Sequence, residues 1–295
     1  MLTSELMNKI RRIELRTRRM VNDSFAGEYH SVFKGRGMEF DEVRPYQPGD
    51  EIRTIDWNVT ARTGTPYVKR YVEERELTVM LVVDMSASED FGSVNRFKRE
   101  VAAEITAVLS FAATTNNDKV GLLIFTDRIE LFIPPRKGRK HVLRLVRELL
   151  AFAPKGKGTD IKLALDTVNQ ILKRRSILFL VSDFIADPQT YRTELDMTNK
   201  RHDVIAVDLS DPLESHMNNV GLVALEDPET GAIAWVDTGD KQWRSAFQER
   251  LTHQIDTTRR TFRKAGVDHI PINTYEDYTV PLTNFFHQRA KRIRH

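Results

Sequence analysis

The chain has 295 residues, of which 40% are hydrophobic and 29% charged, and its formal net charge is +3 at pH 7. This hydrophobic content argues against a chain that is disordered throughout, and so small a charge excess does not by itself indicate a nucleic-acid partner. The chain has no cysteine, which excludes disulfides, thiolate metal sites and a cysteine nucleophile. Its longest apolar runs are strand-sized and its first residues lack a signal-peptide core, so we expect a cytoplasmic protein.

The first 76 residues differ in character from the rest. Apolar residues recur at helical spacing over 1–22, with arginines on the opposite side, which predicts a basic amphipathic helix. Residues 23–76 are rich in glycine and proline and predict loops and short strands. Because this segment has little apolar core of its own, we expect residues 1–76 to pack on a main domain formed by residues 77–295.

Short apolar runs alternate with amphipathic segments from residue 77 onwards. The pattern predicts strands over 78–84, 119–125, 129–133, 176–181, 202–209 and 270–272, helices over 96–115, 141–152, 160–172, 189–199 and 241–265, a hairpin within 222–236 and a last helix at the C-terminus. This alternation is typical of an α/β fold with a doubly wound, mostly parallel sheet. Ligands of such sheets bind beyond the carboxyl ends of the strands, where the strand order reverses.

Oxygen-bearing side chains follow the predicted buried strands directly. Asp84, Ser86 and Ser88 follow the first, Asp183 follows the strand 176–181, and Thr159 lies in a glycine-rich loop before a helix. Two carboxylates and three hydroxyls suit a hard cation, Mg²⁺ or Mn²⁺, better than zinc. Each residue alone is equally compatible with a capped turn, since Asp, Ser and Thr commonly bond local backbone.

At these five residues the chain resembles the von Willebrand factor A domain and its metal-ion-dependent adhesion site. The resemblance implies that the serines and Thr159 bind the ion directly, that the acids bind it directly or through water, and that an acidic side chain of a partner protein completes the shell. Glu89 and Asp90 depart from the family pattern, in which small or apolar residues follow the second serine. These acids either attract a cation or occlude the partner's carboxylate, and Glu89 and Asp160 are candidate partner-binding residues.

A second resemblance lies upstream, in the segment 44–57, which reads RPYQPGDEIRTIDW. It is similar to the signature of a bacterial domain-of-unknown-function family, number fifty-eight, whose members place it just before an A-type domain. The resemblance implies a cytoplasmic bacterial protein, often encoded beside a MoxR-type AAA+ ATPase, with no assigned activity. The residue types favour a structural clasp, with a Pro-Gly turn, Arg–Asp pairs and a tryptophan packed on the sheet. The signature residues are Arg44, Tyr46, Pro48, Gly49, Asp50, Arg53, Asp56 and Trp57.

Known enzyme templates fail, because the chain has no phosphate-binding loop, dinucleotide fingerprint, nucleophile elbow or zincin motif. His141 and His202 lack metal-ligand spacing and are expected to be surface or cap residues. The leading hypothesis is a non-enzymatic, magnesium-dependent protein-binding module. A metal-assisted hydrolase with Glu89, Asp90 or Asp160 as base is the first alternative, and a nucleic-acid binder using the basic termini is the second.

Overall fold

A computed structural model of the chain describes residues 11–13, 15, 27, 29, 32–33, 38–73, 77–90, 92, 97–215, 219–226 and 231–294. The chain divides into two units. The main unit comprises Met1–Val32 and Thr78–His295, and the second unit comprises Phe33–Leu77. The predicted helix over 1–22 lies largely outside the described residues, and so does the turn of the predicted hairpin at 227–230.

The main sheet has six strands among the described residues. They are β3 (Thr78–Asp84), β4 (Lys119–Phe125), β5 (Ile129–Arg136), β6 (Ile177–Ser182), β7 (Asp203–Ser210) and β10 (Asp268–Asn273). Their order is β10-β7-β6-β3-β4-β5, and all neighbours are parallel except β4 and β5. This confirms the predicted α/β fold with a doubly wound, mostly parallel sheet.

Both edge strands of this sheet contain proline. Pro134 and Pro135 lie in β5, and Pro271 lies in β10. Proline has no backbone N–H to donate to a neighbouring strand, so it is tolerated in a sheet chiefly at its edges. The positions of these three residues therefore agree with the observed strand order.

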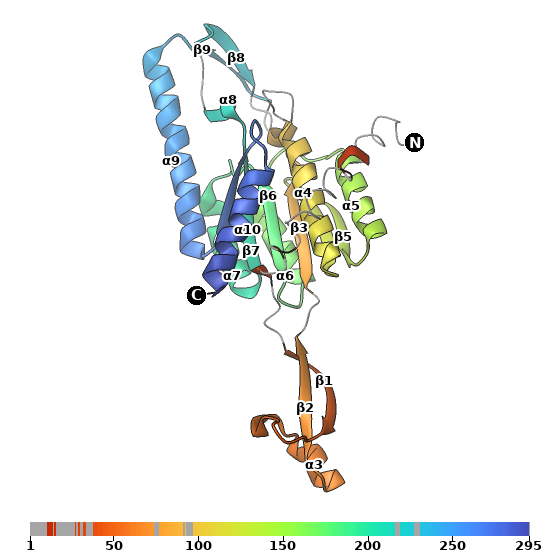
Figure 1. The fold of residues 1–295 in the computed structure, drawn as a ribbon. Coiled ribbons are helices and arrows are strands. Elements are labelled where there is room, and N and C mark those ends of the chain that lie inside the picture. Colours follow the sequence, from red (N-terminus) through yellow and green to blue (C-terminus); the bar gives the residue numbers. More distant parts are fainter. Residues whose placement is uncertain are drawn as a thin grey trace. The chain divides into compact units, whose positions relative to one another are not determined.

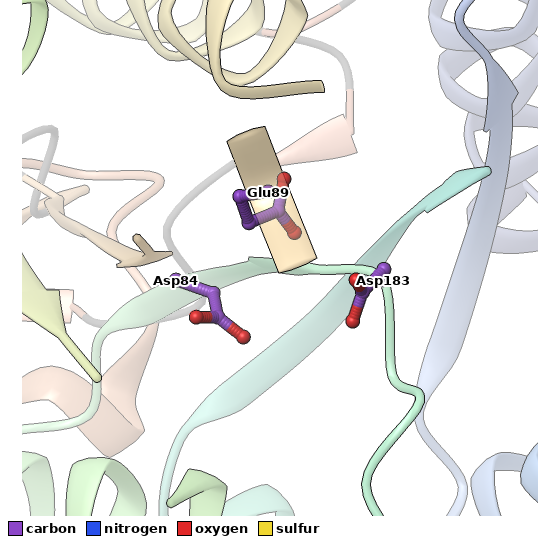
Figure 2. A group of neighbouring side chains, drawn as sticks. All are labelled: Asp84, Glu89 and Asp183. Atoms are coloured by element: carbon purple, nitrogen blue, oxygen red, sulfur yellow. The ribbon is translucent and has the colours of Figure 1, made fainter. Parts of the chain in front are cut away.

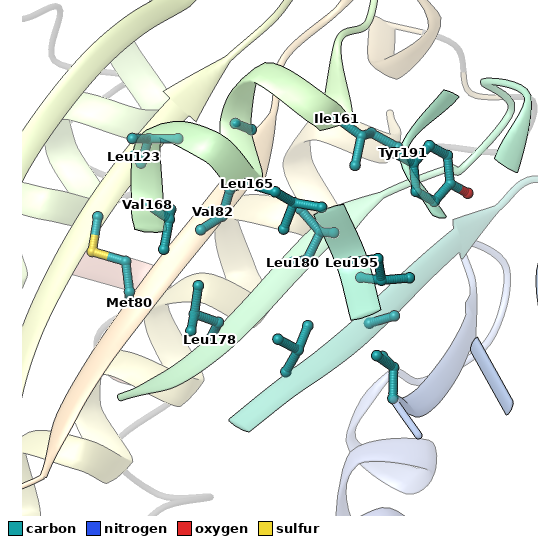
Figure 3. Packing of buried hydrophobic residues seen from close by; sticks show 14 of the residues in the cluster. Met80, Val82, Leu123, Ile161, Leu165, Val168, Leu178, Leu180, Tyr191 and Leu195 are labelled. Carbon is teal, nitrogen blue, oxygen red and sulfur yellow. The ribbon is translucent and has the colours of Figure 1, made fainter. Parts of the chain in front are cut away.

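Helices cover both faces of the sheet (Figure 1). The helices are α4 (Lys98–Thr115), α5 (Arg139–Ala151), α6 (Ile161–Ile171), α7 (Arg192–Arg201), α8 (Pro212–Ser215), α9 (Lys241–Ala265) and α10 (Thr279–Arg294), with short 3-10 turns η3 (Ala87–Asp90) and η4 (Pro188–Thr190). Side chains of α6, α7 and α9 pack with Met80, Val82 and Leu180 in one buried cluster (Figure 3). Helices α4 and α5 cover the opposite face, together with α10 (Figure 1).

The strand order reverses at β3, which lies between β4 and β6 in the sheet. The residues of β3 from Val79 to Asp84 are all buried, because helices cover both faces of the strand. Its carboxyl end and that of β6 lie next to one another, since Val83 pairs with Val181. The reversal point, where such sheets bind ligands, therefore lies at Asp84 and the residues that follow Ser182.

The predicted hairpin within 222–236 is formed by β8 (Leu222–Glu226) and β9 (Ile233–Asp237). It is a separate two-stranded sheet. Leu222, Ile233 and Trp235 are exposed by 66%, 63% and 70%, so this small sheet presents an apolar surface rather than burying one.

The second unit contains more regular structure than the sequence predicts. Strands β1 (Met38–Pro45) and β2 (Tyr67–Glu73) pair antiparallel, and η2 (Ile52–Thr54) and α3 (Trp57–Thr63) connect them. Short strands were expected here, but α3 was not, because seven residues are too few to display a helical period. Asp56 caps α3 by accepting hydrogen bonds from the backbone N–H groups of Asn58 and Val59 at 3.0 and 3.2 Å.

The signature residues form part of the expected clasp. Arg44 donates two hydrogen bonds to the carboxylate of Asp50, at 2.8 and 2.7 Å. The guanidinium lowers the pKa of Asp50, and the backbone N–H of Gln47 adds to this effect. Gly49 has a φ of 106°, a conformation that L side chains rarely adopt, so the turn requires glycine there. Trp57 begins α3 and is 67% exposed.

None of the helices within the described ranges is long and apolar enough to cross a membrane.

Candidate metal site

Three carboxylates meet at the reversal point of the sheet. Asp84 ends β3, Glu89 lies in η3 directly after it, and Asp183 follows β6. Each offers one carboxylate oxygen to a set in which all the atoms lie within 4.8 Å of one another. Figure 2 shows the three side chains around a common centre. The structure thus brings together two residues of the predicted metal set and one residue predicted to bind a partner.

Asp84 is completely buried and both of its oxygens accept hydrogen bonds. Oδ1 accepts from the backbone N–H of Ser86 at 2.9 Å, and Oδ2 accepts from the hydroxyl of Ser182 at 2.7 Å. Burial raises the pKa of Asp84 to about 7, and the nearby charge of Asp183 contributes to the rise. Ser182 has no place in the predicted set, yet it holds Asp84 in position from the neighbouring strand.

The two predicted serine ligands lie beside one another. The hydroxyl oxygens of Ser86 and Ser88 are 3.1 Å apart, and the residues are exposed by only 1% and 7%. The backbone N–H of Glu89 donates to the carbonyl of Ser86 at 3.1 Å and closes the turn. The backbone N–H of Ala87 donates to the carbonyl of Lys157 at 2.9 Å, which ties this turn to the glycine-rich loop.

The glycine-rich loop carries Thr159, which is partly buried. Glu130 fixes this loop by accepting hydrogen bonds from the backbone N–H groups of Lys155 and Gly156, at 2.9 and 2.7 Å. A Cβ on Gly156 would lie 2.0 Å from Asp127 Oδ1 and 2.2 Å from the hydroxyl of Thr126, so a larger residue requires these side chains or the loop to shift.

Asp160, predicted to contact a partner, is the N-cap of α6. Its Oδ1 accepts a hydrogen bond from the backbone N–H of Leu163 at 2.8 Å. This is the ordinary role of an aspartate at the start of a helix. Asp160 is partly buried, so the capping role leaves part of its surface accessible.

The turn that carries Asp183 contains a strained residue. Phe184 has a φ of 50°, in the left-handed region, where a residue with a bulky side chain is an outlier. Its ring is buried and lies 4.9 Å, edge to face, from the ring of Phe262 in α9. Tertiary packing therefore offsets the cost of this conformation, which is of the order of 1–3 kcal/mol.

A buried lysine, which the sequence analysis did not single out, faces the same carboxylates. Lys98 Nζ donates to Asp183 Oδ2 at 2.7 Å and to Glu214 Oε1 at 2.6 Å, and its side chain is 0% exposed. Burial lowers the pKa of Lys98, but the charges of Asp183, Glu89 and Glu214 outweigh this and raise it, so Lys98 is charged. Lys98 begins α4, where a positive charge is unfavourable to the helix dipole, and the carboxylates offset that cost.

Glu89 is the acid of the cluster with the fewest contacts to its carboxylate. It is 1% exposed, and neither of its carboxylate oxygens has a hydrogen-bond partner among the described residues. Burial, together with the charge of Asp183, raises the pKa of Glu89 well above its usual value. With Asp84, Asp183 and Glu214, the cluster holds four acids against the single positive charge of Lys98. A buried carboxylate without partners is costly, and a divalent cation among these oxygens would remove the cost. The residues therefore fit Mg²⁺ or Mn²⁺.

A family comparison agrees with the sequence pattern of the signature segment. The family model described as Protein of unknown function DUF58 matches residues 42–257. The chain belongs to this family. The resemblance drawn from the segment 44–57 is thereby confirmed. A relative of this DUF58 protein is Uncharacterized protein Rv1480 of Mycobacterium tuberculosis (strain ATCC 25618 / H37Rv), 32% identical over 290 residues, or 97% of this chain and 90% of the relative. Uncharacterized protein YeaD of Bacillus subtilis (strain 168) is 27% identical over 107 residues, which cover 36% of this chain and 25% of that protein.

Solved structures similar to this DUF58 protein include two that match most of their own length. The conserved hypothetical protein BatB from Bacteroides thetaiotaomicron has a TM-score of 0.48 at 12% identity, and the match covers 73% of this chain and 99% of that one. The SpRpn10 VWA domain has a TM-score of 0.40 at 13% identity, with 70% of this chain and 94% of that one covered.

The basic C-terminus of the DUF58 protein is partly engaged within the fold. Arg289 donates hydrogen bonds to Asp203 and, at 2.8 Å, to Asp268, and its side chain is only 14% exposed. Arg292 donates to Asp268 at 3.0 Å. Through these ion pairs, part of the arginine cluster holds α10 against β7 and β10. Of the basic N-terminus, the described part includes Arg11 and Arg12, both exposed.

Proposed function

We propose that this protein is a metal-dependent protein-binding module without enzymatic activity. Asp84, Ser86, Ser88, Thr159 and Asp183 would hold Mg²⁺ or Mn²⁺ at the carboxyl ends of β3 and β6. The bound ion would supply positive charge and free coordination positions for a carboxylate of a protein partner. The chain's own residues would position the ion, exclude water from it and set which partner can approach.

The single observation that carries this proposal is the convergence of Asp84, Glu89 and Asp183, with both oxygens of Glu89 buried and unpartnered in the described structure. A structural cluster of acids is expected to satisfy its members with hydrogen bonds or cations. This one has a single lysine and leaves Glu89 unsatisfied. The hydroxyls of Ser86 and Ser88 add neutral oxygens of the kind that Mg²⁺ accepts.

The partner is the least constrained part of the proposal. An acidic side chain is the natural ligand, because a cation that the protein does not fully coordinate attracts a carboxylate. Following the family resemblance, we propose a cytoplasmic complex with a MoxR-type AAA+ ATPase, serving the assembly or maturation of a client protein.

Calorimetric titration with MgCl₂ and MnCl₂ tests the metal part of the proposal. We expect binding to the wild type and its loss in Asp84→Ala, which removes the central ligand. Asp166→Ala is the matched control, because Asp166 lies on α6, away from the cluster, and pairs with the exposed Lys162. An Asp84→Ala variant that binds both ions like the wild type would refute the metal site.

A pull-down with a MoxR-type ATPase from the same organism, in MgCl₂ and in EDTA, tests the partner. We expect capture that depends on MgCl₂ and on Asp84, and capture that ignores both contradicts the metal-bridged mechanism. Assays with phosphoester and peptide substrates test the rival hydrolase. Magnesium-dependent turnover that disappears in Asp84→Ala would favour the hydrolase instead.

A further inference from the structure

We propose that Glu89 is itself a ligand of the bound ion and takes the coordination position that a partner's carboxylate would otherwise fill. The site would then have a closed, self-liganded form, and a partner would compete with a side chain of the same polypeptide. This inference rests on the proposed function, because it needs a metal ion at Asp84 and Asp183.

The first argument is the position of Glu89 on a rigid turn. Glu89 follows Ser88 directly, and its backbone N–H bonds to Ser86. Ala87, in the same turn, is bonded to Lys157 in the glycine-rich loop. The backbone that carries Glu89 is therefore fixed by the same contacts that fix Ser86 and Ser88. The side chain turns inward from this backbone, to the centre that it shares with Asp84 and Asp183 (Figure 2).

The second argument is that the other acids of the cluster already have partners. Asp84 accepts from Ser86 and Ser182. Asp183 and Glu214 each accept a hydrogen bond from Lys98. Glu89 alone of these acids has neither oxygen satisfied within the described structure, although it is 1% exposed. A divalent cation at the shared centre is the group that would satisfy it, because a carboxylate oxygen is a ligand that Mg²⁺ and Mn²⁺ prefer.

The third argument is the closure of the site. Asp84, Ser86, Ser88 and Glu89 are exposed by 0%, 1%, 7% and 1%, and the side chain of Asp183 by 2%. A carboxylate of another protein cannot reach an ion among groups buried to this extent. Partner binding therefore requires the side chain of Glu89 to leave this centre, while the turn Ala87–Asp90 keeps Ser88 in place. Removal of Glu89 from the ion and admission of a partner are thus a single event.

The test uses the full chain and MnCl₂, with acetate as a carboxylate probe. The variant is Glu89→Gln, which keeps the shape of the side chain and removes its charge. The matched control is Glu148→Gln, since Glu148 is exposed on α5 and pairs with Arg147. We expect Mn²⁺ affinity to fall at least about tenfold in Glu89→Gln and to stay unchanged in the control. Acetate should restore part of the affinity in Glu89→Gln and have no effect on the wild type, whose position is filled.

Thermal unfolding separates this role from a merely structural one. Without metal, Glu89→Gln should unfold at or above the wild-type temperature, because glutamine is neutral and avoids the cost of burying a carboxylate. With MnCl₂ the order should reverse. A second variant, Glu89→Asp, keeps the charge on a shorter side chain, and we expect its Mn²⁺ affinity to be intermediate.

Two outcomes would overturn the inference, and they are distinguishable. If the wild type binds Mn²⁺ through Asp84 but Glu89→Gln binds it equally well, Glu89 is not a ligand and the proposed metal-dependent function stands. If the wild type does not bind Mn²⁺, the proposed function fails and the inference fails with it.

Discussion

Replacing Lys98 with methionine tests whether this lysine acts as a built-in cation that competes with a metal ion. Methionine keeps most of the volume and the apolar stem of lysine but removes the charge. In the wild type, Lys98 is bound to Asp183 and Glu214. The substitution therefore leaves four acids at the end of the sheet with no positive charge among them.

The expected loss of stability follows from burial. The side chains of Lys98 and Asp183 are exposed by 0% and 2%, and Glu214 by 26%. Breaking a buried ion pair by removing one partner costs about 3–5 kcal/mol, which corresponds to a fall in Tm on the order of 10 °C. Lys162→Met is the matched control. Lys162 also binds two carboxylates, Asp166 and Glu194, but it is 49% exposed, so its loss should cost at most about 1 kcal/mol.

The assay is thermal and urea unfolding of the wild type and both variants, with and without MgCl₂. If Lys98 and the ion compete for the same carboxylates, MgCl₂ should stabilise Lys98→Met more than the wild type. A tenfold gain in affinity corresponds to about 1.4 kcal/mol of additional stabilisation at saturating ion. The reasoning is refuted if MgCl₂ stabilises the wild type and gives Lys98→Met the same or a smaller gain. Lys98 would then orient Asp183 for the ion rather than compete with it.

Three further predictions concern pH and the glycine-rich loop. The pKa of Asp84 in the folded protein is raised to about 7. Without metal, its contribution to the free energy of unfolding should therefore fall as pH rises from about 4 to 7, by about 1.4 kcal/mol per pH unit. Urea unfolding of the wild type and Asp84→Asn across this pH range measures that contribution. His202 should give the opposite pH dependence of stability. Burial, followed by the charges of Arg201 and Arg175, lowers its pKa to about 4. Stability should therefore be lost as pH falls from about 6.5 to 4, and His202→Phe should remove that dependence. Gly156→Ala should lower both Tm and Mn²⁺ affinity, because the added Cβ meets the buried Thr126 and pushes on the loop that carries Thr159. Unchanged values would show that the side chains of Thr126 and Asp127 move aside and leave the loop in place.

The fold could be predicted from the sequence wherever an element is long or fully apolar. The helix over 241–265 has the predicted bounds, and the buried strands 78–84 and 119–125 do as well. Element ends elsewhere differ by one to three residues, as for α4, which begins at Lys98 rather than at residue 96. Helix α3 escaped prediction because short elements depend on caps and tertiary contacts more than on periodicity.

The candidate site could be predicted only in part. Asp84 and Asp183 could be predicted because Asp84 ends one buried strand and Asp183 directly follows another. Lys98 and Glu214 were missed, because a charged residue beside a helix start is usually solvated. A signal for Lys98 was nevertheless present, since it lies three residues before Val101 and seven before Ile105, on the buried stripe of α4. His202 is the C-cap of α7, which is one of the two roles expected for it, and no signal in the sequence indicates that it is completely buried.

The prolines in β5 and β10 limit how this protein can be recognised. Pro134 and Pro135 on one border of the sheet, and Pro271 on the other, interrupt the row of backbone donors that an added strand would need. These prolines thus hinder the addition of a further strand at either edge of the main sheet, from a second copy or from an extended peptide. Recognition of a protein partner would then use the strand ends, the helices or the exposed hairpin, and the strand ends are where the buried acids lie.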